Sequence, residues 1–358
     1  MLLAFTLPAI AQTNINEKGS LDITGPYRVV ENWFKPGIEQ WNQPITGVAI
    51  DNPSRVFVVS TGQQLTEPGS LIIGPDGATL NVVKHFTPVP VPIAHPTHEH
   101  LILVLNADGK VVEDWSQWNN ELMLPHSVII NPHDPERHVW VVDREGDQIL
   151  EFTNDGKKLV LRIGEKGIAG TDHNHFNWPS SMLFMPDGAF YVTDGYNNTR
   201  VVKFDKNGKY LMEWGTKGDK PGQFNLVHDI AVDSQHRIYV ADRGNNRVQI
   251  FSETGKFIDQ WPNILNPSHF LMMRDGTLWL ISGAGNRIAK FDLSGKLITY
   301  WGTFGREAGN FNDPHTIDVD SAGNLYIVEV FNNRLEKFVP REGADKSRLV
   351  GEKFILTK

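Results

Sequence analysis

Three histidines occupy equivalent places in the chain, and their spacing could build a metal site. His126 and His315 follow a proline, His228 follows a valine, and each histidine begins a short apolar segment. The segments that follow are SVIIN, TIDVD and DIAVD. Neutral imidazole is a common zinc ligand, and three convergent imidazoles with an open fourth position form a catalytic zinc site. We therefore predict that His126, His228 and His315 bind Zn²⁺ if the fold brings them together.

The segments that carry these histidines belong to an internal repeat. Residues 224–261 contain four apolar runs of strand length, namely HDIAV, RIYVAD, RVQIF and KFIDQW. β-Branched and aromatic residues dominate these runs, which indicates β-strands. The same unit recurs at residues 124–163, 176–214, 266–301 and 311–338. Self-similarity at such a period is typical of a propeller or a solenoid.

Turn residues keep the copies in register, because Asp-Gly, Asn-Gly and Ser-Gly pairs suit tight hairpins. The first copy is irregular: its inner strands are expected at residues 47–51 and 55–60, and its outer pair at 101–115. An insertion of roughly residues 61–99 separates them. The last copy lacks a fourth strand, and residues 27–34 resemble the missing one.

The displaced strand favours a ring. We predict an all-β fold, a single six-bladed β-propeller over residues 24–358, closed by the N-terminal strand. Closure removes the exposed edges of the sheets. A sandwich or a solenoid does not explain the displaced strand, and the C-terminal tail is the other candidate for its position. The pattern D-G-x-x-Y-V-x-D-x-x-N-N-R-[VI]-x-x-F, over roughly residues 120–340, resembles NHL repeats.

The register of the repeat places further side chains beside the histidines. Strands alternate in direction within a blade, so the start of the inner strand and the loop after the second strand lie on one face. This predicts Arg144, Tyr196 and Arg243 at the mouth where the histidines converge. Tyr196 interrupts the repeat, because DGYNNTR is one residue longer than DRGNNR, and we interpret it as functional. The recurring aspartates are interpreted as braces for the loops: Asp143, Asp194 and Asp242.

A second group of histidines lies in the insertion. His95, His98 and His100 stand close together there. We interpret them as part of a surface loop, with metal binding as the alternative. The remaining histidines considered have no register argument: His85, His133, His138, His236 and His269.

The overall composition of the chain limits which binding partners and which chemistry are expected. The 358 residues contain 34 Lys and Arg against 42 Asp and Glu, and no basic stripe stands out, so nucleic acid is not an expected partner. The chain has no cysteine, which excludes disulfides and thiolate chemistry. Residues 1–11 resemble the apolar part of a signal peptide with an Ala9-Ile10-Ala11 cleavage site, and this run is too short to span a bilayer. We expect a secreted or periplasmic protein with a flexible mature terminus at residues 12–23.

Five motifs carry a resemblance to a known family. L-P-H-S, D-G-Y-N-N-T-R, V-H-D-I-A-V, A-D-R-G-N-N-R and D-P-H-T resemble motifs of the peptidyl-α-hydroxyglycine α-amidating lyases, or peptidylamidoglycolate lyases. The resemblance implies a six-bladed propeller with three histidines holding zinc in its channel, a tyrosine base and assisting arginines. Carried over by motif, the zinc ligands are His126, His228 and His315, the base is Tyr196, and one arginine is Arg243.

The chain departs from that family at two places. The family's first-blade arginine follows the second strand in a motif like H-R-G, whereas Ser60, Thr61 and Gly62 stand here. Arg144 in the next blade is the candidate that could replace it. The family also places an aspartate, a calcium ligand, directly after the last histidine. Thr316 stands there in this chain, so a structural Ca²⁺ is not supported.

The resulting hypothesis is a zinc-dependent lyase. It would cleave the C–N bond of an α-hydroxyglycine-type carbinolamide to give an amide and glyoxylate. An ordinary tyrosine, with a pKa of about 10, is a poor base at neutral pH; a zinc ion and Arg243 would stabilise the phenolate. The substrate would be a small molecule or a peptide, and a separate hydroxylase is an expected partner.

Two other functions stay open. One is a zinc hydrolase that acts on an ester or a lactone in the same channel through metal-activated water. The other is a non-catalytic exported propeller that binds a peptide or a glycan at its mouth.

Overall fold

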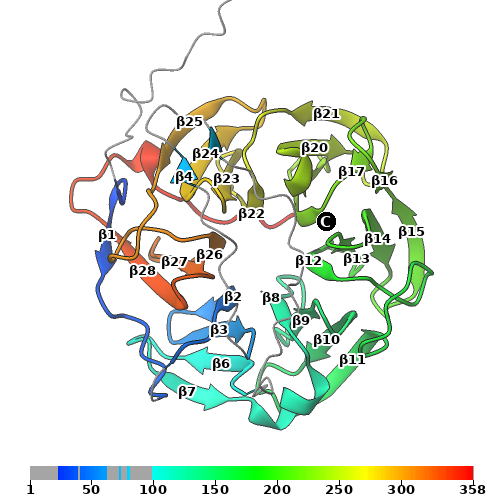
Figure 1. The fold of residues 1–358 in the computed structure, drawn as a ribbon, viewed down its shortest axis with the longest axis horizontal. Coiled ribbons are helices and arrows are strands. Elements are labelled where there is room, and N and C mark those ends of the chain that lie inside the picture. The colour runs from blue at the N-terminus through cyan, green and yellow to red at the C-terminus, as the bar shows by residue number, and fades with distance from the viewer. Residues whose placement is uncertain (1–22, 39–40, 63–71, 74–78, 81–98, 358) are drawn as a thin grey trace, which may run out of the picture.

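Six four-stranded antiparallel sheets form a ring of blades around a central channel (Figure 1). The computed structural model describes residues 23–38, 41–62, 72–73, 79–80 and 99–357. The predicted signal segment 1–11 and nearly all of the predicted flexible stretch 12–23 lie outside these residues. Among the described residues, no helix is long and apolar enough to cross a membrane.

Each blade starts with its inner strand at the channel. The first three blades, listed from the channel outward, are β2 (Ile45–Asn52), β3 (Arg55–Ser60), β6 (Ile102–Leu105) and β7 (Val111–Asp114); β8 (Pro125–Ile130), β9 (Val139–Asp143), β10 (Gln148–Phe152) and β11 (Leu159–Gly164); and β12 (Pro179–Phe184), β13 (Phe190–Asp194), β14 (Arg200–Phe204) and β15 (Tyr210–Trp214).

The other three blades follow the same plan. They are β18 (Val227–Val232), β19 (Ile238–Asp242), β20 (Arg247–Phe251) and β21 (Phe257–Trp261); β22 (Pro267–Met272), β23 (Thr277–Ser282), β24 (Arg287–Asp292) and β25 (Leu297–Trp301); and β26 (Pro314–Val319), β27 (Leu325–Glu329), β28 (Arg334–Pro340) and β1 (Tyr27–Val30). The short elements are β4 (Ile72–Ile73), β5 (Thr79–Leu80), β16 (Thr216–Lys217), β17 (Gln223–Phe224), η2 (Ser116–Glu121), η3 (Arg243–Asn245) and η4 (Lys346–Arg348).

The N-terminal strand closes the ring, as predicted. β1 pairs antiparallel with β28, so the first strand of the chain is the outermost strand of the last blade. The sequence prediction for this strand, residues 27–34, is longer than the observed four residues. The C-terminal tail does not compete for this position. Instead it runs to the centre of the ring, where the Phe354 amide donates to the Met272 carbonyl (Figure 1).

The hydrophobic core lies between the blades. Six clusters of buried side chains each join two neighbouring sheets, and one of them joins blade 6 to blade 1 through Tyr326, Val328 and Val48. Apolar residues on both faces of each sheet therefore become buried, which explains the continuous β-branched runs in the sequence. Because every interface is sheet against sheet, the fold fixes the inner strands around one axis.

The ring closure depends on one tyrosine. Tyr27 on β1 is fully buried, its ring lies 5.9 Å from that of Trp301, and its hydroxyl accepts a hydrogen bond from the Val350 amide at 2.7 Å. It therefore joins blade 6 to both blade 5 and the C-terminal tail.

We expect Tyr27→Ala to lower the free energy of unfolding by about 3–5 kcal/mol, because it leaves a cavity at the closure. Tyr27→Phe should cost about 1 kcal/mol, because the Val350 amide loses its acceptor. Denaturant unfolding measures both. Leu211→Ala on the exposed side of β15 is the control and should change stability by less than about 0.5 kcal/mol. Equal stability of the two Tyr27 variants and the control would show that closure does not depend on this residue.

Candidate metal centre

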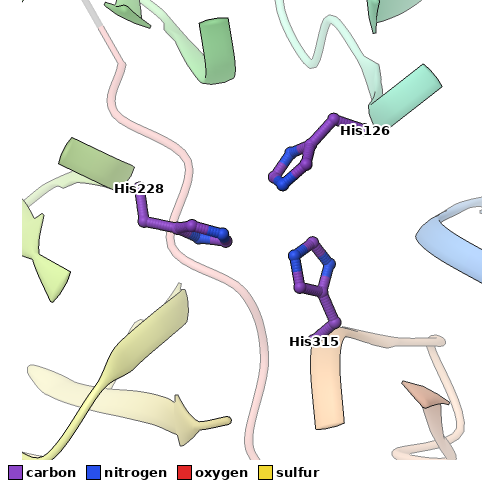
Figure 2. Close-up of side chains that lie close together, drawn as sticks. All are labelled: His126, His228 and His315. Carbon is purple, nitrogen blue, oxygen red and sulfur yellow. The ribbon is translucent and has the colours of Figure 1, made fainter. Parts of the chain in front are cut away.

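The three histidines converge in the channel. Each is the second residue of an inner strand, β8, β18 or β26, and these strands belong to alternate blades. The pairing with the second strand is irregular at each of these points. An irregularity of this kind re-aims a side chain, here toward the channel. Figure 2 shows the three rings pointing toward one another.

The imidazoles are close enough to share one ion. The ring centroid of His126 lies 4.9 Å from that of His228 and 4.6 Å from that of His315. The centroids of His228 and His315 are 5.0 Å apart. One ring nitrogen of each histidine lies within 4.8 Å of the other two. All three side chains are buried, with exposed fractions of 1%, 2% and 5%. The structure therefore confirms the convergence that the repeat predicts.

Hydrogen bonds from the neighbouring blades orient the rings. The Nδ1 atoms of His126, His228 and His315 donate to the backbone carbonyls of Ser180, Ser268 and Thr46, at 2.7, 2.6 and 2.6 Å. These acceptors occupy the histidine register in the three other blades. Because Nδ1 carries the proton, each Nε2 is unprotonated and presents its lone pair toward the centre of the channel. Each blade that has serine or threonine at this register thus fixes the tautomer of the triad histidine in the neighbouring blade.

The surroundings keep all three imidazoles neutral. Burial lowers the pKa of His126 well below its usual value, and His315 and Arg144 lower it further. Burial, and next the Arg243 charge, also lower the pKa of His228 well below its usual value. The same two causes lower the pKa of His315 to about 3. A metal ion binds the neutral imidazole, so these residues are ready to ligate at neutral pH.

The donor set fits a particular kind of ion. Three buried imidazole nitrogens with no carboxylate among them suit a borderline ion such as Zn²⁺, and three protein ligands leave one position for a substrate. Calcium prefers oxygen ligands. At the position where the sequence resemblance implies a calcium-binding aspartate, the Thr316 hydroxyl donates to the Thr46 carbonyl at 2.7 Å. The residues present fit zinc in the channel and do not reproduce that calcium ligand.

Tyr196 lies directly over the triad. It follows β13 in the loop that contains the extra residue, and its amide donates to the Trp178 carbonyl. Its hydroxyl lies 2.9 Å from His126 Nε2 and 3.0 Å from His228 Nε2. The hydroxyl therefore faces the nitrogens that would bind an ion.

Arg243 is fixed at the same point by two other blades. Its Nη1 donates to the Tyr196 hydroxyl at 3.4 Å, and its Nε donates to Asn266 Oδ1 at 3.1 Å. Its Nη2 lies 3.7 Å from Asp313 Oδ1. Burial raises the pKa of Asp313, and the Arg243 charge opposes that rise. Arg243 itself is 5% exposed, so a buried guanidinium points at the tyrosine from a rigid support.

Arg144 reaches the site from blade 2. Its guanidinium carbon lies 5.0 Å from the ring centroids of both Tyr196 and Trp178, a cation–π arrangement. Its Nη2 contacts Glu145 at 3.1 Å, whereas its buried Nε has no hydrogen-bond acceptor. A buried donor without an acceptor is costly, and a bound anion would satisfy it.

The structure brings all six predicted site residues together: His126, His228, His315, Tyr196, Arg243 and Arg144. It adds three that sequence reasoning missed: Trp178, Asn266 and Asp313. Each of these stands two residues before the histidine register of its own blade and has a positive φ, 62°, 44° and 57°. That shared position was the available signal, because the residue types differ while the register is constant.

The other sequence predictions have separate outcomes. Asp143, Asp194 and Asp242 accept hydrogen bonds from the Leu124, Asn177 and Asn225 amides and brace the loops, which confirms their interpretation. His95 and His98 lie outside the described residues. His100 Nδ1 lies 2.5 Å from Asp114 Oδ2 at the edge of blade 1.

The chain is also similar in sequence to known proteins. The family model "NHL repeat" matches residues 224–251. Peptidyl-α-hydroxyglycine α-amidating lyase 1 of Drosophila melanogaster is 31% identical over 288 residues, which cover 72% of this chain and 52% of that protein. Peptidyl-glycine α-amidating monooxygenase A of Xenopus laevis is 29% identical over 328 residues, which cover 87% and 33%. The chain spans about a third of the length of the first curated relatives it matches.

A solved structure matches the fold alone. It is a catalytically inactive virginiamycin B lyase from Staphylococcus aureus with quinupristin, with a TM-score of 0.52, 16% identity and coverage of 89% of both chains. Fold and sequence together define a six-bladed β-propeller of NHL repeats. Within that class, the chain is related to the lyase domains of the peptidyl-glycine α-amidating enzymes, at about 30% identity.

The lowered pKa values of the triad predict how stability depends on pH. An unfolded histidine titrates near pH 6.5. Between that pH and about 3, the unfolded chain binds a proton that the folded His315 does not, so acid destabilises the metal-free protein.

We expect His315→Gln to remove the proton that the unfolded chain takes up at this position. The unfolding free energy of the variant should therefore fall less steeply with acid, by up to about 1.4 kcal/mol per pH unit in that window. Denaturant unfolding in chelator from pH 7 to pH 4 measures it. His236→Gln, which replaces an exposed histidine, is the control. Parallel pH profiles for wild type and His315→Gln would contradict the assignment.

Proposed function

We propose that this protein is a zinc-dependent lyase that cleaves the C–N bond of an α-hydroxyglycine-type carbinolamide. The products would be an amide and glyoxylate. The observation that carries the proposal is the Tyr196 hydroxyl, held 2.9 and 3.0 Å from two nitrogens of a neutral histidine triad. The relation to α-amidating lyases supports the same reaction.

His126, His228 and His315 would hold the ion through their Nε2 atoms. Bound there, zinc supplies a Lewis acid for an oxygen of the substrate. The three carbonyl acceptors in neighbouring blades keep the imidazoles in the ligating tautomer. The chain's own contribution at this point is a preorganised and neutral donor set.

Tyr196 would act as the base. In this reaction the hydroxyl proton of the carbinolamide passes to the Tyr196 oxygen, the C–O bond becomes a carbonyl, and the C–N bond breaks. The departing nitrogen then takes a proton and leaves as the amide, so atoms and charge balance. Arg243 donates to the Tyr196 oxygen and would stabilise its ionised form.

Arg144 would bind the substrate carboxylate. Its Nε lacks an acceptor, and its guanidinium is held over the Tyr196 and Trp178 rings. A guanidinium matches a carboxylate with two parallel hydrogen bonds. Blade 2 would thereby supply the contact that the related family takes from blade 1, where Thr61 stands in this chain.

That same difference favours one second candidate. If Thr61 signals a changed substrate, the triad could serve ester or lactone hydrolysis through metal-activated water. Turnover of an ester without glyoxylate release would support that reaction. Binding of a peptide or a glycan without turnover is the third possibility, and a protein purified without bound zinc would support it.

The biological setting belongs to the same proposal. An α-hydroxyglycine is the product of a hydroxylation, so a hydroxylase would act before this protein as a separate partner. The signal-like residues 1–11 support a secreted or periplasmic location, where an exported peptide or small molecule would be the substrate.

Tyr196→Phe should abolish glyoxylate release from α-hydroxyhippurate, with a loss of at least about 100-fold in kcat, because no group remains to take the proton. Its zinc content should equal that of wild type. A glyoxylate assay paired with metal analysis checks both. Unchanged turnover in this variant would remove Tyr196 from the proposed role.

Arg144→Gln should raise KM for the carboxylate substrate by about 10-fold or more and change kcat less, because it removes a charged contact to the substrate. The methyl ester of the same substrate should show little difference between the two proteins. An equal loss on the acid and the ester would contradict carboxylate binding by Arg144.

A further inference from the structure

The second strand of each blade carries an aromatic residue at one register, and five blades place a cation over its ring. A ring and a cation attract each other most strongly when the ring is that of tryptophan. The five pairs, with distances of 4.9, 4.8, 5.7, 5.7 and 5.0 Å, are Arg55 over Phe57, Lys203 over Tyr191, Arg237 over Tyr239, Lys290 over Trp279 and Lys337 over Tyr326. In the described structure, Trp140 of blade 2 has no such lysine or arginine.

The cations come from two registers. One is the position two residues before the aromatic residue, as with Arg55 and Arg237. The other is the position directly opposite it on the third strand, as Lys203 lies opposite Tyr191. In blade 2 these two registers hold His138 and Glu151, and Glu151 lies opposite Trp140. A position that carries lysine in three blades therefore carries a negative charge in this one.

Glu151 belongs to a compact cluster with two other possible ligands. His138 Nδ1 lies 2.5 Å from Asp134 Oδ2 and 3.6 Å from Glu151 Oε1. One ligand atom of each residue lies within 4.8 Å of the other two. The side chains of Asp134, His138 and Glu151 are 17%, 14% and 14% exposed. They border a cavity of about 470 Å³ between blades 2 and 3.

The cluster has more negative than positive charge. A third carboxylate, Glu136, lies 3.4 Å from His138 Nε2, so three carboxylates surround one imidazole. The ion pairs that the structure shows for these carboxylates all go to His138. Arg137, the nearest arginine in sequence, turns away and pairs with Asp51. Burial raises the pKa of Glu151; the His138 charge opposes this rise and the Asp134 charge adds to it.

We propose that Asp134, His138 and Glu151 form a second divalent-metal site, at which the bound ion replaces the cation that the other blades supply from their own side chains. One imidazole nitrogen with two carboxylate oxygens suits a transition ion such as Zn²⁺. Tetrahedral ligands lie about 3.4 Å apart, so His138 and Asp134 need to separate slightly. Asp134 and His138 lie in and after the hairpin that follows β8, roughly 16 Å along that strand from His126. The site is therefore separate from the channel triad.

The experiment uses His228→Ala as its background, because that change breaks the channel triad and leaves blade 2 intact. The test variant is His228→Ala with Glu151→Lys, which installs the lysine of the repeat. The matched control is His228→Ala with Glu136→Gln, because Glu136 lies outside the three proposed ligands and is mostly exposed. Each protein is dialysed against Zn²⁺ buffered by a chelator, and its zinc content and melting temperature are measured.

We expect one zinc per chain in the background and in the Glu136→Gln control, with a melting temperature that rises when Zn²⁺ is added. Glu151→Lys should weaken zinc binding by more than about 100-fold and abolish the zinc-dependent rise. In chelator, the lysine variant should melt at or above the background, because it restores the cation over Trp140; this also shows that it folds.

Two outcomes would overturn the proposal. One is equal zinc content in the background and the Glu151→Lys protein, which would place the ion elsewhere. The other is a background protein that binds no zinc and melts at the same temperature with and without it. In that case protonated His138 is itself the cation over Trp140. Neither outcome depends on the reaction proposed for the channel, because the channel triad is absent from every protein compared.

Discussion

The channel site depends on hydrogen bonds that cross from one blade to the next. Each histidine of the triad donates from Nδ1 to a carbonyl of the adjacent blade, and the acceptor for His315 is Thr46 in blade 1. That last bond exists only because the ring is closed, with β1 completing blade 6. Closure thus fixes the distance between inner strands, the tautomer of the imidazoles and the direction of their free nitrogens. A change at the closure would therefore act on both stability and the site.

The six-fold repeat gives each blade equivalent positions at the channel, and the residues that differ between blades at these positions form the candidate site. The histidine register holds imidazole in three blades and a hydroxyl side chain in the other three. In blade 3, one extra residue lengthens the loop after the second strand, and this longer loop carries Tyr196. The position before the inner strand holds Trp178, Asn266 or Asp313 in different blades, with the same left-handed backbone. The propeller gives each blade the same place at the mouth and lets each fill it differently.

Charged side chains at the mouth of the channel act on the histidine triad. Burial and two arginines disfavour protonation of the triad, so the three imidazoles in the channel stay neutral. At the mouth each arginine also lies near a carboxylate, Glu145 beside Arg144 and Asp313 beside Arg243. Asn266 and Asp313 hold Arg243, while two aromatic rings hold Arg144. The charges at the mouth are thus held in place before any ligand arrives.

The sequence alone determined the blade count, the closing strand and the convergence of His126, His228 and His315, because a closed repeat turns register into position. It also placed Tyr196, Arg144 and Arg243 on the correct face. Only the tertiary structure decided which partners orient them: the carbonyl acceptors come from other blades, and backbone atoms carry no mark in a sequence. The pairing of Asp313 and Asn266 with Arg243, and of Glu151 with His138, was equally hidden. These contacts join residues whose distance depends on packing between strands and blades, and no local pattern encodes that packing.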